Sequence, residues 1–267
     1  MTCVFYSARL YSLGVNLERP KVSIICCYTS ASKLGYLDAS LNRQDIPVEK
    51  VYIDNSTNRF HNAASALNFG AEESSGELLF FCHQDIKFKS SDSLSKLAAI
   101  AASKLRPGDV GGVAGATNGH AYTMITHGEE ELPYTVGSMF KGESIEVETV
   151  DECVIILPRG TWESHHFDDD ICDSWHFYGV EQGLHAITHH HNVFVFKADV
   201  NHLSSRGTVD ETYFRALRRV MKAYGQLDSI STSVGYWPRK GLERAILKRK
   251  LFEWARGIAV RMGIKKP

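Results

Sequence analysis

The segment Leu78-Leu79-Phe80-Phe81-Cys82 restricts the folds open to this chain more than any other, because it has no polar face. A strand of this kind has to lie inside a sheet that is covered on both sides, as in parallel α/β sheets. The polar residues His83-Gln84-Asp85 follow directly. They stand at the carboxyl end of the strand, where open α/β sheets bind ligands. Burying them without partners would cost stability, so the sequence predicts a functional site here.

The surrounding sequence alternates between strand-like and helix-like segments with short connections. Strands are expected at residues 21–28, 48–54, 78–82, 110–116, 147–157 and 193–196, and helices at residues 32–43, 62–74, 93–105, 175–188 and 209–224. This alternation is the pattern of a doubly wound, mostly parallel sheet flanked by helices. Residues 117–143 show no clear period, which favours an irregular loop over a site.

Composition narrows the class of protein. The formal net charge is −1, so the protein lacks the positive electrostatic field that would attract nucleic acid, and no nucleic-acid partner is expected. The six cysteines form no CxxC pair, which favours small buried side chains in a reducing compartment. No signal peptide is evident, and no apolar run approaches the roughly 20 residues that span a bilayer. The default expectation is a cytoplasmic protein.

The last residues, 239–267, differ from the rest because they hold ten basic and only two acidic residues. A helical stripe runs along them, formed by Leu247, Leu251, Trp254, Ile258 and Met262. A basic amphipathic helix with a tryptophan is typical of binding to an anionic membrane surface, here on the inner face. The alternative is a helix docked on its own domain with a solvated basic face. We expect a main domain at residues 1–207 and a helical extension at residues 208–267.

Four motifs in the first half occur in a familiar order. They are VSIICCYT at residues 22–29, VYIDNST at 51–57, ALNFG at 66–70, and the stretch from Gly76-Glu77 to His83-Gln84-Asp85. Together they resemble family-2 glycosyltransferases, with His83 in place of the first aspartate of the D-x-D motif. The His-Gln-Asp-Ile variant is similar to the streptomycin-biosynthesis-like branch. Weaker similarity follows at residues 150–156, 167–169, 178–184 and 201–205. The resemblance implies a GT-A fold, with the motif-bearing part at residues 21–207.

The resemblance implies a metal-dependent, inverting glycosyltransferase of the hexosyltransferase type. Its donor would be a nucleotide-diphosphate sugar, and its acceptor a hydroxyl of a glycan or lipid-linked molecule in cell-surface glycan or polysaccharide biosynthesis. A divalent cation, Mn²⁺ or Mg²⁺, would neutralise the diphosphate. Asp85 offers a hard oxygen ligand, and His202 a second, nitrogen ligand. The alternatives are an aspartate that caps the next turn and a loop histidine without a ligand.

The same resemblance assigns five residues to binding the nucleotide sugar: Tyr28, Asp54, Asn68, His83 and Asp85. A tyrosine ring can stack on a base, and a carboxylate can accept from a pyrimidine N–H. The alternatives are a strand-end core aromatic for Tyr28 and an Asx turn for Asp54. His83 replaces a carboxylate by an imidazole, which could weaken metal affinity.

The predicted catalytic residues are Glu181, as general base, and Asp151, which would orient the acceptor or donor sugar. Glu181 stands where the family carries its catalytic aspartate, at the start of a helical pattern. The alternative is an ordinary first-turn glutamate. Residues 189–191, three consecutive histidines, lack zinc-type spacing and indicate a polar turn.

Two other functions stay open from the sequence. One is a GT-A-fold module that binds a nucleotide or glycan without turnover. This alternative stays open because His83 and Glu181 differ from the residues that the resembling family has at these positions. The other is a sugar nucleotidyltransferase, which needs a glycine-rich, basic phosphate loop after the first strand. Residues 30–35 contain only one lysine and one glycine, which disfavours it.

Overall fold

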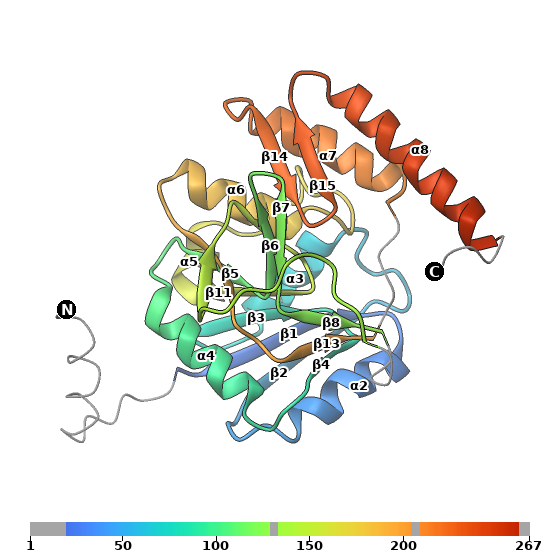
Figure 1. Ribbon diagram of the computed structural model, residues 1–267. Coiled ribbons are helices and arrows are strands. Elements are labelled where there is room, and N and C mark those ends of the chain that lie inside the picture. Colours follow the sequence, from blue (N-terminus) through green and yellow to red (C-terminus); the bar gives the residue numbers. More distant parts are fainter. Residues whose placement is uncertain (1–19, 129–132, 204–208, 262–267) are drawn as a thin grey trace.

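The computed structural model describes residues 20–128, 133–203 and 209–261, and the structural statements below refer to these residues. Its centre is a seven-stranded sheet in the order β2-β1-β3-β11-β5-β12-β9 (Figure 1). These strands are β1 Val22–Tyr28, β2 Glu49–Asp54, β3 Leu78–Cys82, β5 Val110–Gly112, β9 Ser144–Glu146, β11 Val154–Pro158 and β12 Val193–Phe196. Only β9 and β11 run against the others. The predicted mostly parallel sheet is confirmed.

Helices cover both faces of this sheet: α2 Ala31–Leu41, α3 Ala63–Glu72, α4 Ser93–Lys104, α5 Arg159–Ser164, α6 Tyr178–Thr188 and α7 Glu211–Ala223. The last helix, α8 Leu242–Arg261, packs on the core only near its start. The turn chemistry fixes where several of them begin. The side chain of Ser30 accepts a hydrogen bond from the Lys33 amide at the start of α2, and that of Asn62 accepts from the Ser65 amide at the start of α3.

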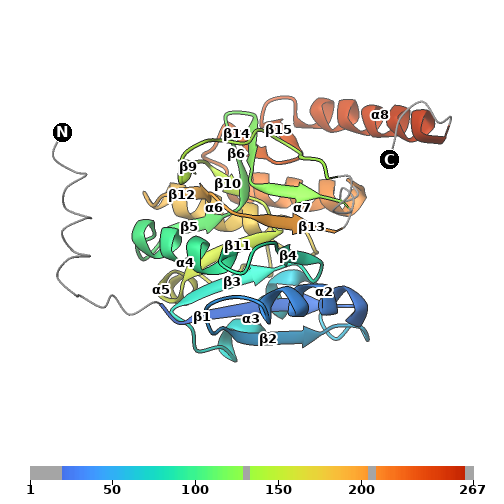
Figure 2. The same ribbon diagram turned by 60° about the horizontal axis from the view of Figure 1, so that its bottom comes forward.

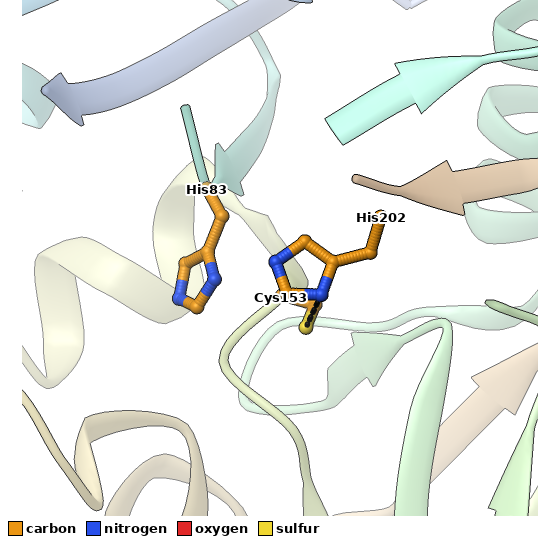
Figure 3. A group of neighbouring side chains, drawn as sticks. All are labelled: His83, Cys153 and His202. Carbon is orange, nitrogen blue, oxygen red and sulfur yellow. Dashed lines mark hydrogen bonds between the residues drawn. The ribbon is translucent and has the colours of Figure 1, made fainter. Parts of the chain in front are cut away.

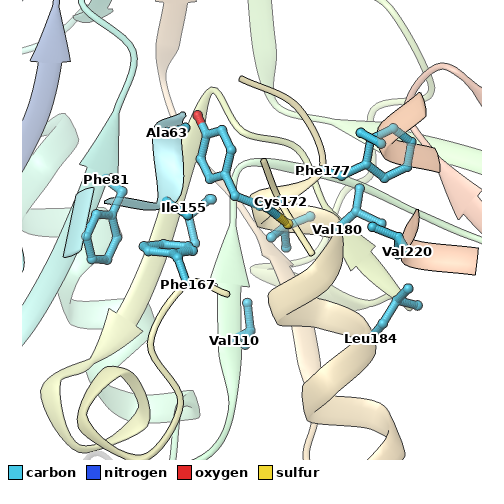
Figure 4. Packing of buried hydrophobic residues seen from close by; sticks show 14 of the residues in the cluster. Ala63, Phe81, Val110, Ile155, Phe167, Cys172, Phe177, Val180, Leu184 and Val220 are labelled. Carbon is cyan, nitrogen blue, oxygen red and sulfur yellow. The ribbon is translucent and has the colours of Figure 1, made fainter. Parts of the chain in front are cut away.

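The buried strand β3 divides its side chains between two hydrophobic clusters, as a pleated strand must. Leu79 and Phe81 pack with α3, α5, α6 and α7, and Figure 4 shows part of this cluster around Ile155 and Phe167. Leu78, Phe80 and Cys82 pack with α2 and α4 on the other face. The segment therefore has no solvated side, which confirms the two-sided burial expected from its composition.

Two segments expected to be single strands are each divided. Residues 110–116 form β5 and the separate β6 Ala114–Thr117, and residues 147–157 form β10 Thr149–Val150 and β11. Between β10 and β11 lies a turn at residues 151–153. Close approach explains the small residues of the first segment: a Cβ atom on Gly111 would meet the ring of Phe196, and one on Gly115 would meet the carbonyl of Thr149.

Three smaller sheets complete the fold. One has the order β10-β6-β7, with β7 at His120–Thr123, and another the order β4-β13-β8, with β4 Ile86–Phe88, β13 Val200–His202 and β8 Ile125–His127. The third is a hairpin of β14 Ser229–Thr232 and β15 Gly235–Pro238, which the sequence did not suggest. Part of the loop expected at residues 117–143 thus forms strands.

The C-terminal elements share the main core up to the start of α8. Phe214 of α7, Trp237 of β15 and Ile246 of α8 belong to the same hydrophobic cluster as β1 and β3. Beyond that point α8 extends away from the body of the molecule (Figure 2). Met262, Lys265 and Lys266, like Ser204 and Ser205 of the late motif, lie outside the described residues. Within the described part, no helix has both the length and the apolar content needed to cross a membrane.

Candidate active site at the carboxyl ends of the strands

The first two strands end side by side, which places Tyr28 opposite Asp54 in the register of β1 and β2. Asp54 is exposed, and its Oδ1 accepts a hydrogen bond from the Ser56 amide at 2.8 Å. This bond forms the Asx turn that the sequence allowed, and with the Ser56 side chain it holds the pKa of Asp54 below its usual value. Burial and the neighbouring Asp54 raise the pKa of Tyr28. The two side chains border an accessible edge of the sheet.

The tripeptide after β3 is anchored at each residue. The amide of His83 donates to the carbonyl of Cys153 at 3.0 Å. Gln84 Oε1 accepts from the amides of Thr29 and Ser30 at 3.1 and 2.9 Å, which ties the end of β3 to the start of α2. These contacts fix the backbone from which the Asp85 side chain projects.

Asp85 is the central carboxylate of the site, and only 4% of the residue is exposed. Its Oδ1 lies 3.1 Å from His202 Nε2, and its Oδ2 lies 3.2 Å from Lys33 Nζ. The antiparallel pairing of β4 with β13, which sets His202 opposite Ile86, brings these distant positions together. The structure therefore juxtaposes the two residues proposed from the sequence as metal ligands.

A group of nitrogen and sulfur donors surrounds His202 (Figure 3). Donor atoms of His83, Cys153 and His202 lie within 4.8 Å of one another. His202 Nδ1 is 3.3 Å from Nδ1 of His127, and His83 Nε2 is 3.2 Å from the hydroxyl of Tyr178. Burial, reinforced by the charge of His202, lowers the pKa of His83 to about 4, so its imidazole is neutral at pH 7.

Two adjacent carboxylates lie in the turn between β10 and β11. Asp151 accepts hydrogen bonds from the Cys153 amide at 3.1 Å and from the Ser233 hydroxyl at 2.5 Å. Burial alone would raise the pKa of Asp151, but these bonds outweigh it and hold the pKa below its usual value. Glu152 accepts from the Phe177 amide at 2.8 Å. Burial and the neighbouring charge of Asp151 raise its pKa. Asp151 thus stays ionised at pH 7, whereas Glu152, with a pKa of about 8, is mostly protonated.

The donor set fits a divalent cation. Asp85 supplies a buried carboxylate and His202 an imidazole nitrogen, a combination suited to Mn²⁺. Lys33 Nζ already lies 3.2 Å from this carboxylate, so a bound cation would share the carboxylate with the ammonium group. Cys153 adds a softer donor that would favour Zn²⁺.

The side chain of Asn68 bonds to residues outside the group around Asp85 and connects parts of the fold. Its Nδ2 donates to the carbonyl of Phe167 at 2.8 Å, and its Oδ1 accepts from the Phe167 amide and from Trp162 Nε1, each at 3.1 Å. The side chain therefore joins α3 to α5 and to the loop after it. Its part in donor binding stays a prediction.

Glu181 also lies apart from Asp85. It is inside the first turn of α6 and 0% exposed. Its carboxylate accepts a 2.5 Å hydrogen bond from the Tyr224 hydroxyl and lies 3.1 Å from His165 Nε2. Among the described residues, no hydrogen bond or ion pair joins it to the group around Asp85. Its role as general base stays a prediction.

Sequence reasoning missed four neighbours of the site. Cys153 was assigned to the core because it stands in an apolar run, and Tyr178 was noted only as part of a motif. His127 falls in a segment without periodicity. Lys33 could have been found, since it lies in the first turn of the helix that follows the first strand, at the same edge as Asp85.

The comparisons with known proteins agree with this architecture. The model of the glycosyltransferase-like family matches residues 29–224. None of the curated proteins matches the chain. Among solved structures, GalNAc-T7 with UDP, GalNAc and Mn²⁺ superposes with a TM-score of 0.59 at 12% identity, over 78% of this chain and 48% of that one.

Two further structures show the same fold. TarS from S. aureus has a TM-score of 0.51 at 17% identity, over 76% of this chain and 39% of that one. The mannosyltransferase PcManGT from Pyrobaculum calidifontis, in complex with GDP-Man and Mn²⁺, has a TM-score of 0.51 at 12% identity, over 85% and 72%. The chain spans less than half the length of GalNAc-T7 and TarS. The fold is that of GT-A glycosyltransferases, and by the family match the chain belongs to the glycosyltransferase-like family.

Proposed function

We propose that this protein transfers a sugar, with inversion, from a nucleotide-diphosphate donor to a hydroxyl of a glycan or lipid-linked acceptor. The observation that carries the proposal is the contact of the buried Asp85 with His202 at the carboxyl edge of the sheet, beside Tyr28 and Asp54. The family match supports it. So do the complexes of GalNAc-T7 with UDP and Mn²⁺ and of PcManGT with GDP-Man and Mn²⁺.

The donor would lie across the ends of β1, β2 and β3. The half-buried ring of Tyr28 offers a stacking surface for the base, and the exposed carboxylate of Asp54 offers an acceptor for a base N–H. Asp85 and His202 would hold a divalent cation, Mn²⁺ or Mg²⁺, which when bound supplies positive charge to the diphosphate leaving group. Lys33, next to the same carboxylate, adds a further positive charge at this edge.

The acceptor proton would pass to a carboxylate of the turn at residues 151–153 rather than to Glu181, the base expected from the sequence, because the Glu181 carboxylate is bonded to His165 and Tyr224. Glu152 is the stronger base of the pair, because burial and the charge of Asp151 raise its pKa to about 8, and the fraction that is ionised at neutral pH would accept the proton. Asp151, held ionised by Ser233 and the Cys153 amide, would orient the sugar hydroxyls. A hydroxyl activated on the face opposite the leaving group attacks in one displacement, and one displacement inverts the anomeric carbon.

A second candidate function is a nucleotide- or glycan-binding module without turnover. The observation that favours it is the neutral His83 at a position where the resembling family has a carboxylate, which leaves one acid fewer around the cation. The two functions differ in turnover but not in donor binding.

We also place α8 on an anionic membrane surface as part of this proposal. Trp254 is 68% exposed and Leu251 57% exposed, and Leu247 and Ile258 continue the same exposed stripe. A docked helix would bury this stripe, so the alternative of a helix packed on its own domain describes only the first turns. Such a surface would bring a lipid-linked acceptor to the enzyme at the inner membrane face.

Several basic side chains of α8 are paired with acidic side chains, so fewer of them are available to anionic lipids than the sequence suggests. Arg249 and Arg256 pair with Glu253, and Lys250 pairs with Glu211 of α7. Arg244 and Lys248 are the basic residues of α8 that are exposed among those whose side chains the structure describes. Apolar insertion should therefore contribute more to membrane binding than charge does.

The test of the transferase is a panel of nucleotide sugars incubated with the protein and Mn²⁺. Release of nucleotide diphosphate with transfer or hydrolysis of the sugar supports turnover, and loss of this activity in Asp85→Asn ties it to the site. Tight donor binding by calorimetry without any turnover would replace the transferase by the binding module. No donor binding by any nucleotide sugar would refute both.

A further inference from the structure

A second group of metal-binding side chains lies outside the candidate active site, where the end of α5 meets α6. It consists of His165, Glu181 and His185, whose donor atoms all lie within 4.8 Å of one another. His165 caps the carboxyl end of α5, and Glu181 and His185 are four residues apart on α6. Side chains four apart on a helix share one face, so both α6 donors are directed to the side on which His165 lies.

The distances already approach those of a coordination site. His165 Nε2 lies 3.1 and 3.2 Å from the two carboxylate oxygens of Glu181. Donors on a tetrahedral Zn²⁺ with bonds of about 2.0–2.1 Å stand about 3.3 Å apart. The His185 ring stacks on the His165 ring, with centroids 3.4 Å apart and planes inclined by 4°. The remaining adjustment falls on His185, whose ring also stacks on that of His189 with centroids 4.0 Å apart, so metal binding would require it to leave these stacks and turn toward the carboxylate.

The carboxylate of Glu181 is in an environment that favours a cation. It is fully buried, and its partners are the Tyr224 hydroxyl and the His165 imidazole. In the described part of the chain no lysine or arginine pairs with it. A buried carboxylate without a permanent cation is costly, and a bound metal would remove that cost. Tyr224 would orient the carboxylate from outside the coordination sphere.

We infer that His165, Glu181 and His185 bind a first-row transition metal, with Zn²⁺ the best fit and water as the fourth ligand. Two imidazoles and one carboxylate suit Zn²⁺, whereas Mg²⁺ and Ca²⁺ prefer sites made of oxygen. Both imidazoles are only half-buried, which leaves an entry path for the ion. The metal would join the end of α5 to α6, and this inference does not depend on the proposed transferase activity.

The experiment has to separate this site from the donor group at His83, Cys153 and His202. We would use the full chain carrying His202→Gln, strip it with a chelator, and titrate it with Co²⁺ and Zn²⁺. One Co²⁺ per chain is expected, with visible ligand-field bands but no thiolate charge-transfer band, since the three donors include no sulfur. Zn²⁺ should displace the Co²⁺ and raise the melting temperature.

The deciding variant is His185→Gln in the same His202→Gln background. It should weaken binding more than about 100-fold, because even residues outside the coordination sphere typically contribute 10- to 100-fold to metal affinity. The exposed His120→Gln is the matched control and should bind normally. Unchanged Co²⁺ affinity after His185→Gln, or no binding to the His202→Gln protein, would overturn the inference. If His202→Gln fails to fold, the Co²⁺ spectrum of the wild-type protein can be measured instead. A site that includes the Cys153 thiolate gives a charge-transfer band, and the site at His165, Glu181 and His185 does not.

Discussion

His83 should make the protein less stable as the pH falls, and His83→Gln should remove most of that dependence. Burial, with the charge of His202 as the second cause, lowers the folded-state pKa of His83 to about 4. In the unfolded chain the imidazole returns to a pKa of about 6.5. Between these values the unfolded state binds more protons than the folded state, so stability is lost as pH drops through about 6.5 toward 4.

The magnitude follows from the two pKa values. The full shift of about 2.5 units corresponds to about 3.4 kcal/mol, approached only below pH 4. At pH 5 the linkage relation gives a loss of about 2 kcal/mol, against about 0.2 kcal/mol at pH 7. Lowering the pH from 7 to 5 should therefore cost about 1.8 kcal/mol through this one side chain.

Urea unfolding at pH 7 and pH 5, on metal-free protein, measures the effect. His83→Gln keeps a polar group for the Tyr178 hydroxyl but cannot titrate, so its loss of stability should be smaller than that of wild type by about 1.8 kcal/mol. His120→Gln, at an exposed position, should lose as much as wild type. If all three proteins lose the same free energy, His83 is not held neutral by its surroundings, and the electrostatic account of the site is wrong.

Three other predictions address the site and the tail. Asp85→Asn should abolish Mn²⁺-dependent donor binding in calorimetry while the fold, followed by circular dichroism, persists; normal Mn²⁺ binding would contradict the assignment of Asp85. Glu152→Gln should lower kcat at least about 100-fold with little change in donor affinity, because a general base typically contributes at least that much to the rate. If only Glu181→Gln causes such a loss, Glu181 is the general base, as expected from the sequence. Replacing both Leu251 and Trp254 by serine should reduce co-sedimentation with anionic vesicles more than 0.5 M salt does, and equal binding of variant and wild type would refute a docking role for α8.

The sequence predicted the parts of the structure that depend on local pattern. The apolar run at residues 78–82 indicated a strand covered on both faces, and β3 lies between two hydrophobic clusters. Asp85 was expected at the carboxyl edge of the sheet, where the structure places it. The contact between Asp85 and His202 could be proposed only through the family resemblance, because 117 residues separate them and a smaller sheet joins them.

The remaining features depend on which way a side chain points, which local pattern does not specify. Glu181 was expected at the start of a helical pattern, and it lies in the first turn of α6, but its carboxylate points toward His165 and Tyr224. Cys153 is buried in a hydrophobic cluster, as the sequence indicated, but the turn before β11 also brings its sulfur to 3.9 Å from His202 Nδ1, a contact that no local pattern specifies. Tertiary packing decides both cases.

The hairpin of β14 and β15 has a consequence for how this chain can be cut or recombined. Ser233 at its tip donates to Asp151, and the carbonyl of Ser231 accepts from Thr149 at 2.6 Å. The loop that carries the two acids is therefore shaped by residues about 80 positions later. A shortened chain that stops before the hairpin should lose the alignment of Asp151 even if the sheet survives. In chimeras made with related proteins, residues 149–153 and 229–238 should be exchanged together, because the second segment holds the first in place.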